Sequence, residues 1–166
     1  MGVVTTESRG ASQTCARKGA AQRVQFWRGC GAYRDDRAHL TLRGHSYGST
    51  TAGLALRQAT GVDDAVFFGS PGLGTDHIAD LRLSAVHVHY LEARDDVIGA
   101  LGILGVDPSH LEGISQASTG ESTVVDPTTG LVRHFHEVTG HSSYLDEDST
   151  SQYNVSVIVA GLPDRR

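Results

Sequence analysis

Residues 38–59 read AHLTLRGHSYGSTTAGLALRQA. The stretch begins with a short apolar run at residues 39–42, passes through the turn sequence GHSYG at residues 44–48, and continues with helical character over residues 49–59. A G-x-S-x-G motif between a strand and a helix is typical of a nucleophile elbow, a tight turn that exposes a serine hydroxyl. We therefore expect Ser46 at the tip of a strand-to-helix turn.

The two glycines of this motif indicate how tight the turn is. We expect strand and helix to lie so close that a side chain at Gly44 or Gly48 would collide with backbone. Ser46 itself is expected in an unfavourable backbone region, a cost that active sites tolerate. Small and apolar residues then recur at helical spacing, which predicts a helix packed closely on a sheet.

The length and composition are those of a globular protein. The 166 residues suffice for one domain with a real core, since a domain near this size buries about 70% of its unfolded surface. No apolar run is long enough to span a membrane, and the start lacks the apolar region of a secretory signal. Cys15 and Cys30 are too few for a disulfide framework and lack zinc-site spacing. We expect a cytoplasmic protein.

The net charge of −5 is unevenly spread along the chain. Residues 1–37 hold seven Lys and Arg against three Asp and Glu, whereas residues 38–166 hold seven against sixteen. A basic arm of this kind is able to bind nucleic acid or an anionic surface. The absence of interleaved aromatic residues and the acidic remainder oppose a nucleic-acid partner. Residues 1–37 show no clear helix or strand period, so we predict a basic, poorly ordered segment.

Two further strands are predicted after the elbow. Residues 65–68, AVFF, form a continuous apolar run that suits a central parallel strand. Residues 85–91, AVHVHYL, alternate and place His87 and His89 on one face. The sequence EARDD follows at residues 92–96, and carboxylates at the carboxyl end of a parallel strand lie on the ligand-binding edge of an open α/β sheet.

The rest of the chain, residues 97–166, is more polar. Residues 97–106 predict a loop or short helix, residues 113–118 a short strand, and residues 119–140 a long excursion with a turn at residues 126–130. Residues 149–160 fit either a strand or a helix, and we predict a helix, with Asp148 or Ser149 as N-cap and Gly161 as its stop. The whole pattern predicts an α/β fold with a mostly parallel sheet flanked by helices.

Three of these segments carry the groups of a nucleophilic triad in the order Ser, acid, His. Ser46 would attack a carbonyl, and His141 in the late sequence GHSSY would act as general base and then general acid. Asp96, or alternatively Asp95, would orient the imidazole. The backbone N–H of Tyr47, at the start of the helix, would be one oxyanion-hole donor.

Four blocks, GHSYGSTTAGLAL, VFFGSPG, EARDD and HSSYLDEDSTSQYN, resemble an uncharacterised actinobacterial α/β-hydrolase family, a domain of unknown function. The resemblance covers roughly residues 38–162 and implies an α/β-hydrolase sheet with Ser46, an Asp of EARDD and His141 as its site. That family often has a proline after its acidic residue. Val97 stands there in this chain, which aligns Asp96 with the family carboxylate.

The same resemblance bears on the start of the chain. Members of that family carry several strands and helices before the elbow, and one of their loops supplies the second oxyanion donor. Only residues 1–37 precede the elbow region here. The resemblance thus implies an N-terminally shortened chain that lacks the early strands, with residues 38–166 as the C-terminal part of a hydrolase domain.

Other residues allow competing interpretations. His45 is expected to be a packing neighbour because its backbone direction takes it away from Ser46. The pairs His87/His89 and His134/His136 have a spacing that suits a metal, but no third ligand follows at a clear spacing. We therefore predict no metal and no cofactor. Residues 69–74 lack a phosphate-binding motif and are expected to line the active site, with Ser70 helping to shape the pocket.

The sequence predicts a serine hydrolase that acts on a small-molecule ester, without nucleic acid or a membrane span. Two alternatives stay open. The chain could be a truncated or inactive hydrolase fragment, or a non-catalytic binding module that uses the same cleft.

Overall fold

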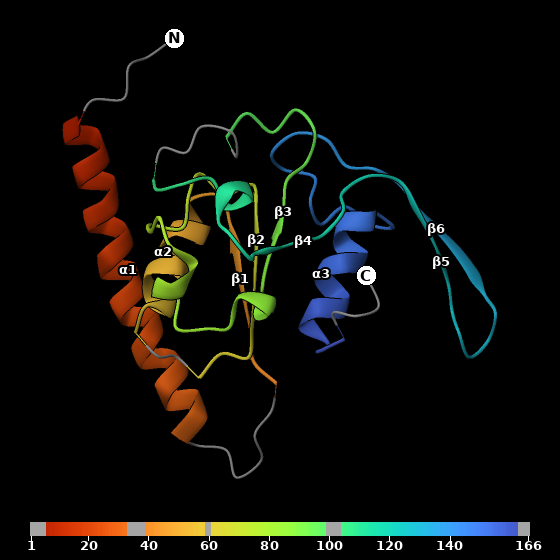
Figure 1. Cartoon of the computed structure of the whole chain (residues 1–166), viewed down its shortest axis with the longest axis horizontal. Coiled ribbons are helices and arrows are strands. Elements are labelled where there is room, and N and C mark those ends of the chain that lie inside the picture. The colour runs from red at the N-terminus through yellow and green to blue at the C-terminus, as the bar shows by residue number, and fades with distance from the viewer. Residues whose placement is uncertain (1–5, 33–38, 59–60, 99–103, 163–166) are drawn as a thin grey trace.

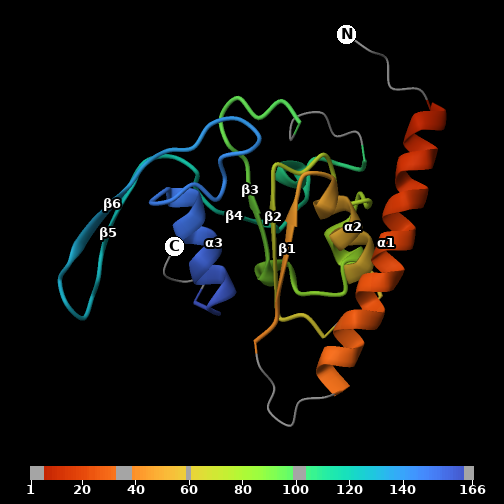
Figure 2. The same cartoon turned by 180° about the vertical axis from the view of Figure 1, so that it is seen from behind.

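A computed structural model describes residues 6–32, 39–58, 61–98 and 104–162. Its centre is a four-stranded parallel sheet in the order β1-β2-β3-β4. The strands are β1 (Thr41–His45), β2 (Asp64–Phe68), β3 (Val88–Leu91) and β4 (Ser115–Gln116). Helices α1 (Thr6–Ala32) and α2 (Tyr47–Leu56) lie on one side of the sheet and α3 (Thr150–Val159) on the other (Figures 1 and 2).

The β2 strand is the centre of the core because both of its faces are covered. All five of its residues are buried, as its continuous apolar run predicts. Phe67 packs in a cluster with Leu42 and Leu56, whereas Val66 and Phe68 pack in a second cluster with residues of α3. Successive side chains of a strand point to opposite faces, so this one strand joins the two halves of the core.

The first helix is a correction to the sequence-based expectation. Residues 6–32 form α1, so the prediction of a poorly ordered segment is wrong there; residues 1–5 and 33–37 lie outside the described residues. Ala16, Ala20 and Val24 are buried at a spacing of four and pack against Leu54 and Ala55 of α2. These buried residues are small and lie among basic residues and glycines, so the sequence shows no clear helical periodicity of apolar residues. Between α1 and the sheet, α2 is buried throughout residues 49–56.

The β3 strand is shorter than predicted. Residues 85–87 form a 3₁₀ turn and the strand begins at Val88. His87 and His89 instead share one acceptor, because Asp64 Oδ1 lies 3.0 Å from His87 Nδ1 and 3.3 Å from His89 Nε2. The other oxygen, Oδ2, lies 3.0 Å from His39 Nε2. A buried carboxylate needs such partners, and this cluster sits at the amino end of β2, away from the elbow.

The predicted polar excursion contains a β-hairpin. Strands β5 (Ser122–Val125) and β6 (Val132–Phe135) pair antiparallel and extend away from the main sheet (Figure 1). The predicted turn is confirmed, since the Asp126 carboxylate accepts from the N–H groups of Thr128 and Thr129. The sequence did not indicate the two strands, whose residues are mostly exposed.

The last helix and the short fourth strand are confirmed. Ser149 is the N-cap of α3 and its hydroxyl accepts from the Gln152 N–H. At the other end Gly161 has a φ of 70°, and the N–H groups of Gly161 and Leu162 bond back to the carbonyls of Ile158 and Val157. This is a Schellman ending, in which a glycine adopts the left-handed conformation.

The prediction for residues 97–106 falls largely on residues 99–103, which are outside the described part of the chain. Across the described ranges, no helix combines the length and apolar character needed to cross a membrane.

Candidate active site

The elbow has the strained geometry that its motif predicts. Ser46 lies between β1 and α2 with φ 54° and ψ −135°, a region that costs energy for a residue with a side chain. Its N–H donates to the Phe68 carbonyl across the strand ends, at 3.1 Å. The turn therefore places the Ser46 side chain at the carboxyl edge of the sheet.

Only one of the two motif glycines is required by close packing. A Cβ on Gly44 would lie 2.7 Å from the Ser49 Cα, closer than real Cβ atoms approach backbone. At Gly48 an added Cβ would meet nothing within 4 Å, so the prediction of a collision is wrong for that position. The reason is direction: Gly44 faces the helix that folds back over it, whereas Gly48 faces open space.

The structure brings three of the candidate residues into one hydrogen-bonded chain. The Ser46 Oγ lies 2.8 Å from His141 Nε2. On the other side of the ring, His141 Nδ1 lies 3.0 Å from each oxygen of the Asp96 carboxylate. An ionised carboxylate only accepts, so Nδ1 carries the ring proton and Nε2 is left to accept from the serine. Ser46 and His141, which are 95 positions apart in sequence, are thus brought into hydrogen-bond contact.

The two alternative acids lie in very different places. The Asp96 side chain is fully buried, whereas that of Asp95 is 79% exposed and lies 3.9 Å from the Arg94 guanidinium. Asp95 also has a φ of 64°, which turns the chain so that consecutive carboxylates diverge. The geometry therefore groups Asp96, and not Asp95, with His141.

The sequence did not indicate Tyr144 as part of this site, and it indicated Gly69 only as a member of the loop at residues 69–74. The Tyr144 hydroxyl donates to Asp96 Oδ2 at 2.7 Å, and Ile98 N–H donates to Oδ1 at 3.0 Å. Gly69, with φ 56°, lies so close that an added Cβ would approach Asp96 Oδ2 to 2.8 Å and His141 Nδ1 to 3.0 Å. Gly69 and Tyr144 occur in the sequence blocks that resemble the family. The local sequence of those blocks does not indicate that the two residues contact Asp96.

The groups around the serine support the turn. Tyr47 is the first residue of α2, so its N–H lies at the positive end of the helix dipole. The Ser49 hydroxyl contacts the Ser46 carbonyl at 2.5 Å and the buried Ser70 hydroxyl at 2.6 Å. Ser70 thus holds the elbow from the loop after β2.

His45 contacts His141 rather than Ser46. Its Nε2 lies 2.8 Å from the His141 carbonyl oxygen and its ring stacks on Phe68 at 5.2 Å. The expectation that His45 is a packing neighbour agrees with these contacts.

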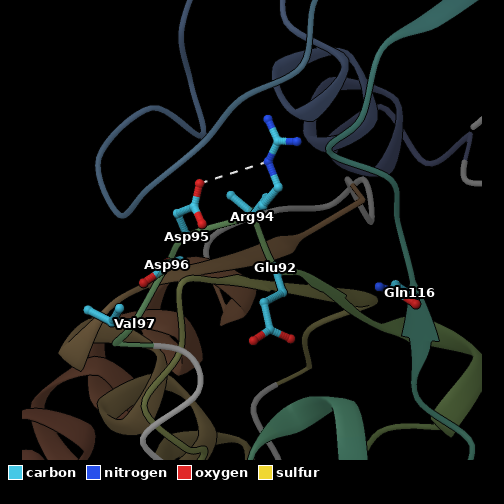
Figure 3. A pocket seen from close by; sticks show the side chains of 7 residues that line it. Glu92, Arg94, Asp95, Asp96, Val97 and Gln116 are labelled. Carbon is cyan, nitrogen blue, oxygen red and sulfur yellow. Dashed lines mark ion pairs between the residues drawn. The ribbon is translucent and has the colours of Figure 1, made fainter.

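An open cavity of about 430 Å³ adjoins the acid (Figure 3). It is lined by Glu92, Ala93, Arg94, Asp95, Asp96, Val97 and Gln116. Figure 3 shows the Glu92 carboxylate pointing away from Arg94 and Asp95, with Gln116 of β4 to one side. Burial, followed by the negative charges of Asp107 and Asp96, raises the pKa of the Glu92 carboxyl above its ordinary value.

The histidine pairs are held by other partners. His134 Nδ1 lies 2.9 Å from the Thr123 hydroxyl, and His136 lies between the carbonyls of Glu137 and Glu147. Within the described ranges, no three side chains of His, Cys, Asp or Glu are arranged to hold a metal ion.

Comparisons with known proteins bear on the family and the fold of this chain. A protein-family model described as "Alpha/beta hydrolase" matches residues 4–106, well over half of the chain, and includes α1. Uncharacterized proteins of Mycobacterium tuberculosis and Mycobacterium bovis are each 34% identical over 96 residues. The match covers 55% of this chain but only 36% of each relative.

No solved structure matches this chain. The family match, together with the parallel sheet and its flanking helices, confirms the predicted fold class. This chain belongs to the alpha/beta hydrolase family.

Proposed function

We propose that this chain is a serine hydrolase that cleaves a carboxylic ester through an acyl-enzyme. The observation that carries the proposal is the unbroken contact from Ser46 Oγ through His141 to the buried Asp96 carboxylate. A nucleophile, a base within hydrogen-bond reach and a third group that orients the base are the parts that acyl transfer needs.

The first half-reaction forms the acyl-enzyme. Ser46 Oγ attacks the ester carbonyl carbon while His141 Nε2 takes the hydroxyl proton. The carbonyl oxygen becomes an oxyanion, which the Tyr47 N–H at the helix start stabilises, and the helix dipole adds to this field. As the intermediate collapses, the bond to the leaving alkoxide breaks and His141 delivers its proton to that oxygen.

The second half-reaction restores the enzyme. A water molecule takes the place of the alcohol and gives a proton to His141 Nε2 as its oxygen attacks the acyl carbon. Collapse of the second intermediate breaks the acyl bond to Ser46 Oγ, which recovers its proton from His141. The carboxylic acid product then leaves.

Asp96 acts through the imidazole. Its negative charge fixes the proton on Nδ1 and stabilises the imidazolium that forms during both steps. Burial strengthens this effect because charges interact more strongly where water is excluded. Asp95 cannot replace it without a rearrangement of the loop, since its side chain points to solvent.

The substrate is proposed to lie across the carboxyl edge of the sheet. The open cavity beside Asp96 offers room for one part of a small ester, and the carboxylate, guanidinium and amide groups in its lining suit a substrate with hydrogen-bonding groups. Neither a metal nor a cofactor takes part in the proposed steps.

The test is turnover of p-nitrophenyl acetate by the full chain, compared with two single variants. Ser46→Ala removes the proposed nucleophile, whereas Ser142→Ala removes an exposed hydroxyl next to the base. We expect Ser46→Ala to lower kcat/KM at least 10³-fold and Ser142→Ala to leave it within about twofold. Equal turnover by wild type and Ser46→Ala would reject the proposed nucleophile. Ester binding without turnover would point to a binding module.

A further inference from the structure

The buried Asp96 carboxylate has a side-chain hydrogen-bond donor besides His141, the Tyr144 hydroxyl. Besides His141, it accepts from the Ile98 N–H in its own loop and from the Tyr144 hydroxyl in the loop that carries His141. The Ile98 contact is local to the acid. The Tyr144 contact joins two different loops, one that carries Asp96 and one that carries His141. The relative position of these loops sets the distance between Asp96 and His141.

The hydroxyl of Tyr144 has a fixed direction. Its oxygen accepts from the Ala93 N–H at 2.8 Å, so its proton is directed at Asp96 Oδ2, 2.7 Å away. A carboxylate has no proton of its own to offer, which leaves one arrangement of this pair. The tyrosine therefore bridges the end of β3 and the acid.

The ring and backbone of Tyr144 are also held in place. The side chain is 1% exposed and packs beside Phe68 at 5.5 Å and His45 at 5.9 Å between ring centroids. Its carbonyl accepts from the Ser151 hydroxyl in α3 at 2.6 Å. Burial, together with the neighbouring Asp96 charge, raises the pKa of Tyr144, so the hydroxyl keeps its proton at the pH of ester hydrolysis.

We propose that Tyr144 is a positioning residue that fixes Asp96 against His141. His141 lies three residues before Tyr144 in the same loop. This inference rests on the proposed function for its kinetic consequence, but the contact itself is testable without turnover. Because Tyr144 is buried, it cannot touch a substrate, and it acts only through the acid.

Removal of the hydroxyl has a predictable electrostatic effect. With one donor fewer, the Asp96 charge is shared among fewer hydrogen bonds and attracts the imidazolium more strongly. Among the described residues, the titratable groups that face His141 are Asp96 and His45, and the His45 and His141 ring centroids lie 4.8 Å apart. Glu92, at the end of β3, interacts electrostatically with Asp96 and Tyr144. None of these groups changes in Tyr144→Phe.

The experiment compares wild type, Tyr144→Phe and Tyr153→Phe. Tyr153 is the matched control because its ring packs on Phe135, in the hairpin, and it loses the same atom. The His141 ring is titrated by NMR, with its signal assigned from His141→Asn, and kcat and KM are measured across pH with p-nitrophenyl acetate.

The expected result has three parts. In Tyr144→Phe the titration midpoint of His141 and the acid limb of the kcat/KM profile both move to higher pH. The kcat falls about tenfold, whereas KM stays within about twofold of the wild-type value. Tyr153→Phe shows none of these changes. A folded Tyr144→Phe protein with an unchanged His141 midpoint would overturn the proposal.

A second variant covers the case in which Tyr144→Phe does not fold. Site-specific 3-fluorotyrosine at position 144 keeps the ring and the hydroxyl but makes the hydroxyl a stronger donor. The His141 midpoint is then expected to move to lower pH, and no shift would equally overturn the proposal. If wild type has no ester turnover while both midpoints shift as expected, the positioning contact stands and the proposed function fails.

Discussion

Gly69 lies directly against the carboxylate of Asp96. Its φ is 56°, and an added Cβ would come within 2.8 Å of Asp96 Oδ2 and 3.0 Å of His141 Nδ1. Any side chain here would enter the space in which Asp96 and His141 meet. The loop after β2 therefore packs against the contact between these two residues.

Gly69→Ala is expected to disturb the site more than the fold. The left-handed backbone costs about 1–2 kcal/mol for alanine, and the Cβ also displaces Asp96 or His141. A displacement of this size is expected to lower kcat about 10²-fold. Gly130→Ala is the control, because Gly130 has a φ of 70° but open space around it. Activity retained in Gly69→Ala but reduced in Gly130→Ala would contradict this role.

The two glycines of the elbow are expected to respond differently to alanine. Gly44→Ala forces a Cβ to within 2.7 Å of the Ser49 backbone, so we expect a loss of unfolding free energy of at least about 2 kcal/mol. Gly48→Ala meets open space in the first turn of α2 and is expected to be neutral or stabilising by up to about 1 kcal/mol. Urea unfolding of both variants measures the difference, and a larger loss for Gly48→Ala would count against the description of the turn.

Much of this architecture could be predicted from local sequence. Ser46 in its strand–turn–helix setting, the buried run of β2 and the cap residues Ser149 and Gly161 are each specified by neighbours within a few positions. Such features can be recognised in the sequence because the interactions that cause them join residues close together in the chain.

The features that escaped prediction depend on distant surfaces. The buried stripe of α1 consists of Ala16, Ala20 and Val24, whose burial depends on the facing surface of α2. The contact between Tyr144 and Asp96 depends on two loops 48 residues apart in sequence. Within the motif, Gly48 and Gly44 look equivalent. They differ in the direction in which a Cβ would point, toward the Ser49 backbone from Gly44 and into open space from Gly48.

Asp96 and Asp95 offer a direct test of the proposed acid. Asp96→Asn presents an amide to His141 Nδ1 and favours the wrong tautomer, so kcat is expected to fall about 10²- to 10⁴-fold. Asp95→Asn changes an exposed side chain and is expected to stay within about twofold. Both variants are assayed with p-nitrophenyl acetate after their folding is checked by circular dichroism. The opposite order of effects would assign the role to Asp95.

Glu92 gives a prediction about pH and stability. Its pKa is raised from 4.5, chiefly by burial, so the folded protein holds this proton more tightly than the unfolded chain. By linkage, stability is lost as pH rises from the unfolded pKa through the raised folded pKa, and above both pKa values the ionised carboxyl leaves folding less favourable by a constant amount. Glu92→Gln removes that contribution.

The variant is therefore expected to be more stable than wild type at neutral pH, with the difference shrinking to zero as pH falls below about 4.5. Urea unfolding of both proteins across this range measures it. Glu112→Gln, which removes an exposed carboxylate, serves as the reference. A difference that grows toward acid pH has the wrong sign and would refute the prediction.

The most direct measurement of the central proposal is peptide mass spectrometry after treatment with a fluorophosphonate. We expect one adduct, on the peptide that contains Ser46, because the probe reacts with a serine that an adjacent imidazole activates. The adduct is expected to be absent in Ser46→Ala and strongly reduced in His141→Asn. A folded, monodisperse protein that shows no adduct, or an adduct on another serine that persists in Ser46→Ala, would contradict the proposal.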